Sequence, residues 1–174
     1  MERPTPDRIP PGYEGYIALV PEGDVIRTLE AQIEDTLSLL RQVPADREDF
    51  RYREGAWSIR EVMVHVADTE RVMAYRALSF GRGDPTPLPL MDQDLWMADL
   101  DLGERTLADI AEEFQAVRAA TLHLFRSLGE DAASREGPVG DNTFSIATLA
   151  WMIAGHELHH RSLLEERYLA EPAP

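Results

Sequence analysis

The sequence predicts an all-α fold, a four-helix bundle. Four segments of about 20 residues carry apolar side chains at helical spacing. Helix N-cap signals open two of these segments. The composition, 44% hydrophobic and 28% charged, is that of a soluble globular protein. The length of 174 residues fits one domain, so we expect residues 1–174 to fold as one unit.

The N-terminal segment, residues 1–23, contains five prolines and three glycines. It is predicted to be an extended arm that packs through Tyr13 and Tyr16, with its first few residues disordered. The first long helix is predicted over residues 24–42. Asp24 is its N-cap, and Pro44 ends it.

The second long helix has the clearest start. Ser58 and Glu61 have the spacing of a capping box, in which the hydroxyl accepts from a backbone N–H and the carboxylate reaches back. Gly81 and Gly83 end this helix. Residues 81–104 then form a long connection with three prolines, which can cross the bundle and which includes a short helix near residues 92–99.

The third long helix is predicted from Thr106 to Gly129, and the fourth from Ser145 to about Leu169. Residues 130–144 between them form a polar, glycine-rich loop with at most a short strand pairing. The triplets Trp57-Ser58-Ile59 and Phe144-Ser145-Ile146 match, which hints at pseudo-symmetry between two helical hairpins.

Composition excludes several functions. The chain has no cysteine, so disulfides, thiolate catalysis and cysteine-based zinc sites are ruled out. The net charge is −15, and all 17 cationic residues are arginine, without a basic cluster. Such a surface repels nucleic acid and anionic membranes. No apolar run is long enough for a membrane span or a secretory signal, so we expect no membrane association and a cytoplasmic location.

Three of the five histidines lie close together, at positions 156, 159 and 160. On a helix, His156 and His160 are one turn apart on one face, the apolar one, where two imidazoles can bind one ion. The pair His156 and His159 is also within reach, and spacing favours the first pair only modestly. Burying imidazoles on an apolar face is costly unless their nitrogens are satisfied, and a metal satisfies them.

The segment from His156 to His160 also matches the His-Glu-x-x-His pattern of metalloproteases. No suitable third ligand follows it before the chain ends. Glu157 is the residue that would act as base in a hydrolase, but it points about 100° away from His156 around the helix. A surface position, or an indirect role behind the ligands, is the better interpretation.

A third ligand must therefore come from another helix. The candidate is His65, in the first third of the second helix, with Asp68 one turn further on as a residue that can orient its ring. A histidine between two valines is otherwise more often structural. His123 has no acidic or histidine neighbour at ligand spacing, so it is interpreted as structural.

Two stretches together resemble the DinB/YfiT-like superfamily of metalloenzymes over nearly the whole chain. They are residues 57–68, from Trp57 to Asp68, and residues 156–161, from His156 to Arg161. The resemblance implies a four-helix bundle and a three-histidine metal site formed by His65, His156 and His160, with His159 outside it. Members often continue the last motif as Arg-Gly-Gln, whereas Ser162 and Leu163 follow Arg161 here.

The resemblance also implies an activity. Family members include S-transferases that use bacillithiol or mycothiol, and a mycothiol-dependent isomerase. The expected cofactor is a divalent transition metal, and the sequence does not separate zinc, nickel, iron or manganese. Three imidazoles leave coordination positions open, and an ion so held can lower the pKa of a bound thiol or water. A metal-dependent thiol S-transferase is therefore expected, with a small-molecule thiol and an electrophile as partners.

Two alternatives remain at this point, a metal-dependent hydrolase and a non-catalytic metal-binding or interaction module. An enzyme needs a cavity over the ion, and residues 84–104 are the expected wall. Trp96 is either part of that wall or an ordinary core residue. Arg118 and Arg161 either bind an anionic cosubstrate or pair with surface carboxylates, which is the default. The resemblance also implies a homodimer.

Overall fold

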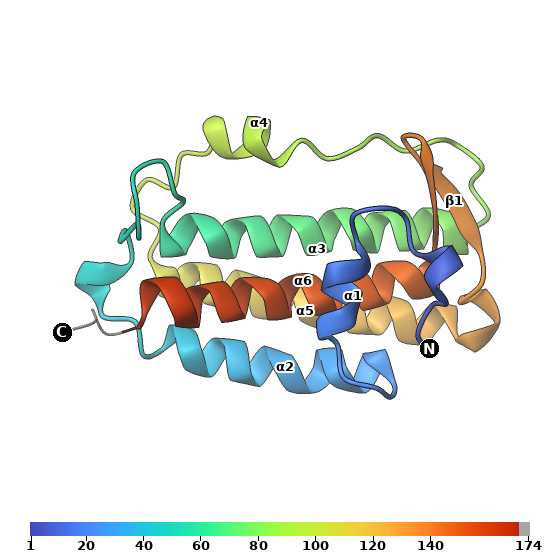
Figure 1. The fold of residues 1–174 in the computed structure, drawn as a ribbon, viewed down its shortest axis with the longest axis horizontal. Coiled ribbons are helices and arrows are strands. Elements are labelled where there is room, and N and C mark those ends of the chain that lie inside the picture. Colours follow the sequence, from blue (N-terminus) through green and yellow to red (C-terminus); the bar gives the residue numbers. More distant parts are fainter. Residues whose placement is uncertain (171–174) are drawn as a thin grey trace.

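The computed structural model describes residues 1–170, and four long helices form its bundle (Figure 1), as the sequence predicts. These helices are α2 (Val25–Leu40), α3 (Ile59–Gly81), α5 (Leu107–Leu128) and α6 (Ile146–Leu163). The shorter elements are α1 (Glu14–Leu19), α4 (Gln93–Ala98), the strands β1 (Glu136–Val139) and β2 (Asn142–Ser145), and a π-helical turn at Leu164–Tyr168. Short 3-10 helices are also present at Pro6–Arg8, Ala45–Arg47 and Glu130–Ala132. No described helix is long and apolar enough to cross a membrane. The predicted domain limits, 1–174, include four residues outside the described part.

The predicted helix starts are confirmed. Asp24 accepts the Ile26 amide at the start of α2. Ser58 and Glu61 form the capping box of α3, and Thr106 and Asp109 form a second one at α5. Side-chain caps satisfy backbone N–H groups that have no partner within the helix, which explains why these boundaries can be read from sequence.

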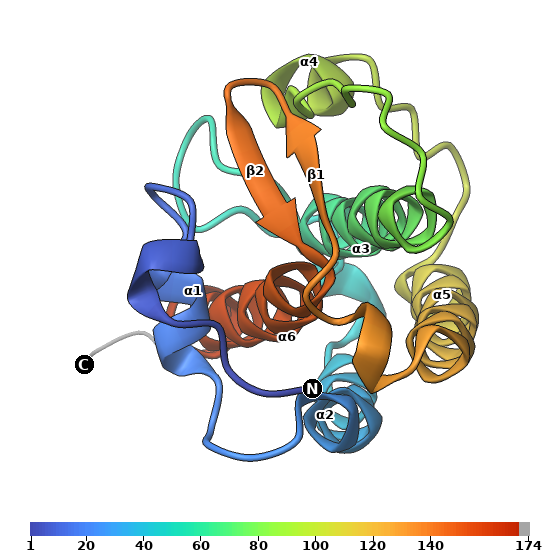
Figure 2. The ribbon, with the colours of Figure 1, turned by 90° about the vertical axis from the view of Figure 1, so that its right-hand side faces the viewer.

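Neighbours in the sequence are not neighbours in the bundle. Seen end-on (Figure 2), α2 and α3 lie diagonally opposite, and each packs against α5 and α6. The hint of two helical hairpins was therefore wrong, because α2 does not pack along α3. The repeated triplets mark a common start instead, since Ser58 caps α3 and Ser145 caps α6 through the Thr148 amide.

Helices α3 and α5 run in the same direction. Their starts are close, because Arg60 donates to the Arg105 carbonyl, and their ends meet where Leu128 packs against Gly81. A chain leaving the end of α3 must therefore travel back along a helix of 23 residues, about 34 Å. The connection between them does this over α3 and includes α4 (Figure 1), which confirms the expected crossover and short helix.

The N-terminal segment differs from the prediction of an extended arm with a disordered start. It forms helix α1, which lies across α6 (Figures 1 and 2). Met1 is buried, and its carbonyl accepts from the Trp151 indole. Arg3 stacks over the Trp151 ring and donates to the Ile17 carbonyl. The proline and glycine content suggested an extended segment, and nothing in the sequence indicated these contacts, because partners such as Trp151 lie far along the chain.

The loop before α6 contains the short pairing that the sequence allowed. Strands β1 and β2 form an antiparallel hairpin, with Gly137 opposite Phe144. Any side chain at position 137 would collide with the Phe80 ring, because an added Cβ would lie 2.0 Å from it. The hairpin lies at one end of the bundle, where β1 contacts α3 and β2 contacts α6 (Figure 2).

A buried polar layer divides the apolar core into two clusters. One cluster gathers around Trp151 and Phe144, and the other around Phe114 and Tyr168. Between them, residues with side chains that are both polar and buried face each other from all four long helices. They are Gln32, Thr36, His65, Thr69, Glu70, Arg118, Thr121, His156, Glu157 and His160.

Arg118 is the centre of that layer. From α5 it donates to both oxygens of Glu70 on α3, at 2.9 and 2.7 Å, and to Glu157 on α6, at 2.7 Å. Its remaining Nη1 donates to the Leu29 carbonyl of α2 at 2.9 Å. One guanidinium therefore joins all four bundle helices. Although burial opposes the charge, attraction by Glu157 and Glu70 raises the pKa of Arg118 above its ordinary value.

The close contact between α1 and α6 yields a stability prediction. A Cβ at Gly155 would lie 2.1 Å from the Tyr16 carbonyl oxygen, so Gly155→Ala must displace α1. We expect a loss of roughly 1–3 kcal/mol in the free energy of unfolding, measured by urea denaturation. The control is Gly15→Ala within α1, where a Cβ meets no atom within 4 Å. It should be neutral or stabilising by up to about 1 kcal/mol. Equal effects at the two glycines would contradict this packing.

Candidate metal centre

Three buried histidines converge between α3 and α6. His65 comes from α3, and His156 and His160 come from α6, one turn apart. Their exposed fractions are 3%, 7% and 8%, and their ligand atoms all lie within 4.8 Å of one another. The structure therefore brings together the three residues that the resemblance implies as ligands. It places His159 outside the group.

The spacing of the nitrogens fits a shared ion. The Nε2 atom of His156 lies 3.0 Å from Nε2 of His65 and 3.1 Å from Nε2 of His160. Two imidazole nitrogens bound to one ion at about 2.0–2.1 Å lie roughly 2.9 Å apart at a right angle and roughly 3.3 Å apart at a tetrahedral angle. The two distances in the structure fall between these limits.

Hydrogen bonding alone does not account for this arrangement. A neutral imidazole nitrogen carries either one proton or one in-plane lone pair. The Nε2 atom of His156 can therefore make only one of its two close contacts as a hydrogen bond. A cation at the centre accepts the lone pairs of all three nitrogens at once, so these residues fit a divalent metal.

The three imidazoles are in the form that a metal requires. Burial lowers the pKa of His65 to about 4 and that of His160 to about 3. The pKa of His156 also lies well below its ordinary value, because burial and the neighbouring rings of His160 and His65 disfavour its protonation. All three are neutral at pH 7, so no proton must be displaced before they bind an ion.

Packing holds the ring of His65 in place. The Trp57 ring lies against it, with the two ring centres 4.9 Å apart. The expected contact with Asp68 is absent, since Asp68 pairs with Arg71 at 2.9 Å. Ligand histidines usually donate their second N–H to an acceptor. Within residues 1–170, Nδ1 of His65 and Nδ1 of His160 have no hydrogen-bond partner.

The other two histidines are exposed. His159 lies on the outer face of α6, where its ring contacts the edge of the Tyr16 ring. His123 lies on the surface of α5, away from the cluster. A position on the surface of the helix explains why neither joins the group.

Two charged residues have roles that the sequence did not predict. Glu157 is 2% exposed, and its carboxylate accepts from Thr36, Gln32 and Arg118, so it belongs to the buried layer and not to the surface. Because both oxygens of the Glu157 carboxylate already accept hydrogen bonds, this residue is unsuited to take up a proton as a base. Arg118 is likewise buried, which corrects the default of surface pairing. Arg161 does pair at the surface, with Asp35.

A cavity of about 110 Å³ reaches His65 and His156. Tyr13 and Tyr16 of the N-terminal segment form one side, and Leu90, Met91 and Gln93 of the crossover connection form another. The expectation that residues 84–104 wall the site is therefore confirmed. Trp96 does not line this cavity and is not a core residue either, because it is 47% exposed and lines a neighbouring one.

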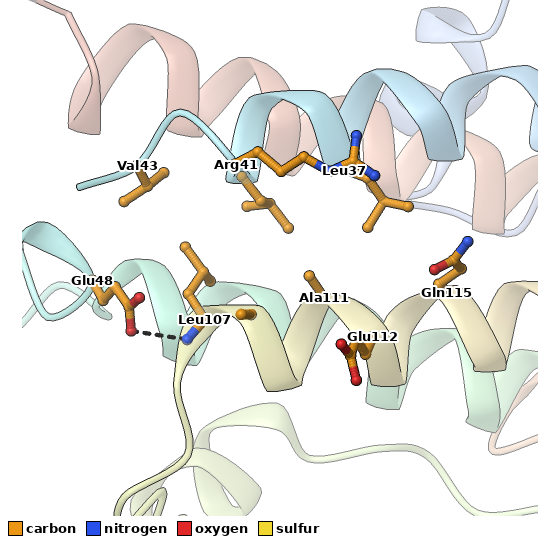
Figure 3. A pocket seen from close by; sticks show the side chains of 10 residues that line it. Leu37, Arg41, Val43, Glu48, Leu107, Ala111, Glu112 and Gln115 are labelled. Carbon is orange, nitrogen blue, oxygen red and sulfur yellow. Dashed lines mark hydrogen bonds between the residues drawn. The ribbon is translucent and has the colours of Figure 1, made fainter. Parts of the chain in front are cut away.

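A second cavity, of about 390 Å³, lies between α2 and α5 (Figure 3). Its charged residues include Arg41, Glu48 and Glu112. Glu48 is occupied, because it accepts the Leu107 amide at the start of α5 at 2.8 Å. No histidine lines this cavity, so the candidate metal site is the histidine cluster between α3 and α6 and not this cavity.

Comparison with known proteins identifies the family. The family model of the DinB superfamily matches residues 28–164, which include all three clustered histidines. A protein of Oceanobacillus iheyensis, provisionally named a metal-dependent hydrolase, is 29% identical over 111 residues, 63% of each chain. This chain thus spans about 63% of the length of that relative.

Solved structures share the fold. YfiT from Bacillus subtilis, described as a probable metal-dependent hydrolase with an unusual four-helix bundle topology, matches with a TM-score of 0.68 and 20% identity. The match covers 84% of this chain and 87% of YfiT. A mycothiol-dependent maleylpyruvate isomerase matches with a TM-score of 0.65 and 16% identity, over 84% of this chain and 62% of the isomerase.

The geometry predicts which histidines bind a metal. His65→Ala, His156→Ala and His160→Ala should each weaken zinc binding by at least about a hundredfold, since each removes one of three ligands. Competition with a chelating dye measures the affinity. His123→Ala and His159→Ala are matched controls and should bind as the wild type does. Loss of binding in His159→Ala, with His160→Ala unaffected, would contradict the assignment.

The pKa values predict how pH affects the metal-free protein. The pKa values of His65, His156 and His160 in the folded protein lie below the value of about 6.5 in the unfolded chain. As the pH falls below 6.5, these histidines are therefore protonated in the unfolded chain before they are protonated in the folded protein. Stability should be full above pH 6.5 and fall as the pH is lowered toward 4. Between pH 6.5 and 5, urea denaturation should show a loss of roughly 1–2 kcal/mol per buried imidazole. His160→Leu should reduce this loss, and His123→Leu should not. A pH dependence identical in both variants would contradict the prediction.

Proposed function

Because the chain belongs to the DinB superfamily, we propose that it is a divalent-metal-dependent enzyme in which His65, His156 and His160 hold the ion. The observation that carries the proposal is the convergence of three buried, neutral imidazoles, two of which, those of His65 and His156, line a cavity. A structural site closes its coordination sphere with four protein ligands, whereas three imidazoles leave positions for a substrate.

The chain's own residues have three tasks in this proposal. The three histidines bind and orient the ion, and their low pKa values keep them available in mildly acidic solution. Tyr13 and Tyr16 narrow the cavity and restrict entry of water. When bound, the ion supplies electrostatic stabilisation of an anionic nucleophile.

The reaction we propose first is thiol S-transfer. The chain has no cysteine, so a thiolate nucleophile must come from a low-molecular-weight thiol. A fold shared with a mycothiol-dependent isomerase supports this choice. The thiol attacks an electrophilic carbon, the new C–S bond forms as the leaving group departs with its electron pair, and the thiol proton passes to solvent.

A metal-dependent hydrolase is the second candidate. It is favoured by the relative from Oceanobacillus iheyensis and by YfiT, both of which are named as hydrolases of this kind. Water then replaces the thiol as nucleophile, and no thiol is consumed. A metal-binding module without activity is the third possibility, and it predicts metal binding without turnover.

Metal-dependent turnover tests the proposal. Metal-loaded protein should transfer bacillithiol, mycothiol or glutathione to 1-chloro-2,4-dinitrobenzene or another electrophile of a panel, and chelation should abolish this rate. A free thiol with a pKa near 8.5 is only a few per cent thiolate at pH 7. The enzymatic rate should nevertheless persist down to about pH 6, since the ligand histidines protonate only near pH 4.

The controls separate the candidates. His65→Ala should lose activity, and His123→Ala should keep it. Turnover of ester or amide substrates without any thiol would favour the hydrolase. A rate that rises with pH as the free thiol ionises, and that a chelator does not change, would show that the metal does not activate the nucleophile.

The homodimer stays a prediction, based on the family resemblance. Light scattering of the protein at micromolar concentration should give about twice the mass of 19.6 kDa. A mass near one chain would contradict it.

A further inference from the structure

Arg76 is a buried arginine without a carboxylate partner. It lies on α3 and is 5% exposed, and its only hydrogen bond within residues 1–170 goes from Nη2 to the Pro89 carbonyl, at 2.9 Å. No carboxylate of residues 1–170 forms an ion pair with it. The contrast with its neighbours is clear, since Arg71 pairs with Asp68 and Glu113, and buried Arg118 pairs with two glutamates.

A mostly buried guanidinium that lacks an anion destabilises a protein, because it has lost part of its hydration without gaining a charged partner. Burial lowers the pKa of Arg76, because the surrounding protein solvates the charged guanidinium less well than water does. Its Nε and Nη1 groups donate to no protein acceptor in the described part of the chain, and they are not sealed from solvent. These donors are therefore free for a ligand.

Arg76 faces the metal cavity. It lines the cavity of about 110 Å³ together with His65 and His156. His65, Thr69 and Arg76 are spaced by four and seven residues, so they lie on one face of α3. Side chains on a helix lean toward its N-terminus, which directs Arg76 back along the cavity toward His65. The guanidinium of Arg76 and the imidazoles of His65 and His156 thus line one cavity.

An apolar cavity of about 350 Å³ adjoins this space. Val72, Arg76, Leu90 and Met91 line both cavities. The larger, mainly apolar one is also lined by Tyr75, Leu88, Pro89, Trp96 and the ion pair of Asp68 with Arg71. The small cavity has room for only three or four water-sized groups. The larger one lies in the size range of small-molecule sites. A ligand with one anionic end, bound by Arg76, and an apolar body, lying in the larger cavity, fits the two cavities together.

We propose that Arg76 binds the carboxylate of a small organic acid whose apolar part lies against Trp96 and Tyr75, which makes this residue a determinant of substrate class. A planar guanidinium pairs with a planar carboxylate through two parallel hydrogen bonds, which Nε and an Nη group can donate together. The idea that the acid reacts at the histidine cluster rests on the proposed function, whereas binding of the carboxylate at Arg76 does not.

A matched pair of probes tests this. Calorimetric titration compares 4-phenylbutanoate with 4-phenylbutanamide, which has the same shape without the charge. The titrations use both zinc-loaded and chelator-treated protein, so that a carboxylate bound to the ion is distinguished from one bound to Arg76. Wild type should prefer the acid by about tenfold or more in both forms.

The variants assign the preference to one residue. Arg76→Met should abolish it, and Arg76→Lys should retain part of it. Arg60→Met on the same helix should leave it unchanged, because Arg60 pairs with Asp49 and lines neither cavity. Trp96→Ala should weaken both probes equally. Arg76→Met should melt at or above the wild-type temperature, since it removes an unpaired buried charge.

Several results would overturn the proposal. They are an acid preference that survives Arg76→Met, a preference that disappears on chelation, and the absence of binding of either probe to the wild-type protein at millimolar concentration. A marked fall in the melting temperature of Arg76→Met would show that the residue is structural. Failure of metal-dependent turnover, with the acid preference intact, would count against the proposed function and not against this site.

Discussion

The guanidinium of Arg118 is the interaction on which the arrangement of the bundle depends. It is the point at which α2, α3, α5 and α6 meet, and all its bonds are buried. Apolar packing tolerates sliding of one helix along another, whereas a buried charge left without its partner costs several kcal/mol. The Glu70–Arg118–Glu157 network therefore specifies one register for four helices.

That register also positions the histidines. Glu157 follows His156 directly in α6, and consecutive residues point about 100° apart, so a carboxylate held at the bundle centre directs the imidazole toward α3. On α3, Glu70 is anchored in the same network five residues after His65. A shift of α6 by one residue would separate the Nε2 atoms now 3.0 Å apart. The network of Arg118 therefore also fixes the relative positions of the histidines on α3 and α6.

Local signals in the sequence predicted much of this structure. Capping residues set the starts of α2, α3 and α5, and helical spacing placed His156 and His160 on one face, because both effects act within a few residues. The choice of this pair over His156 and His159 came from the family resemblance. The sequence did not predict helix α1 or the network of Arg118, because the residues that contact the N-terminal segment and Arg118 lie far from them along the chain. One usable signal was present. Arg118 occupies a position four residues after buried Phe114 and seven before buried Phe125, where an apolar residue is expected. Arg76 gives the same kind of signal, three residues after buried Met73 and four before buried Phe80, but only the structure shows that it lacks a carboxylate partner.

Anomalous diffraction from crystals of the protein loaded with zinc tests the central claim most directly. The account predicts one strong peak, about 2.0–2.1 Å from each Nε2 atom of His65, His156 and His160, with non-protein ligands in the remaining positions. A peak coordinated by His159, or zinc bound only by surface carboxylates while the three imidazoles contact one another, would contradict it.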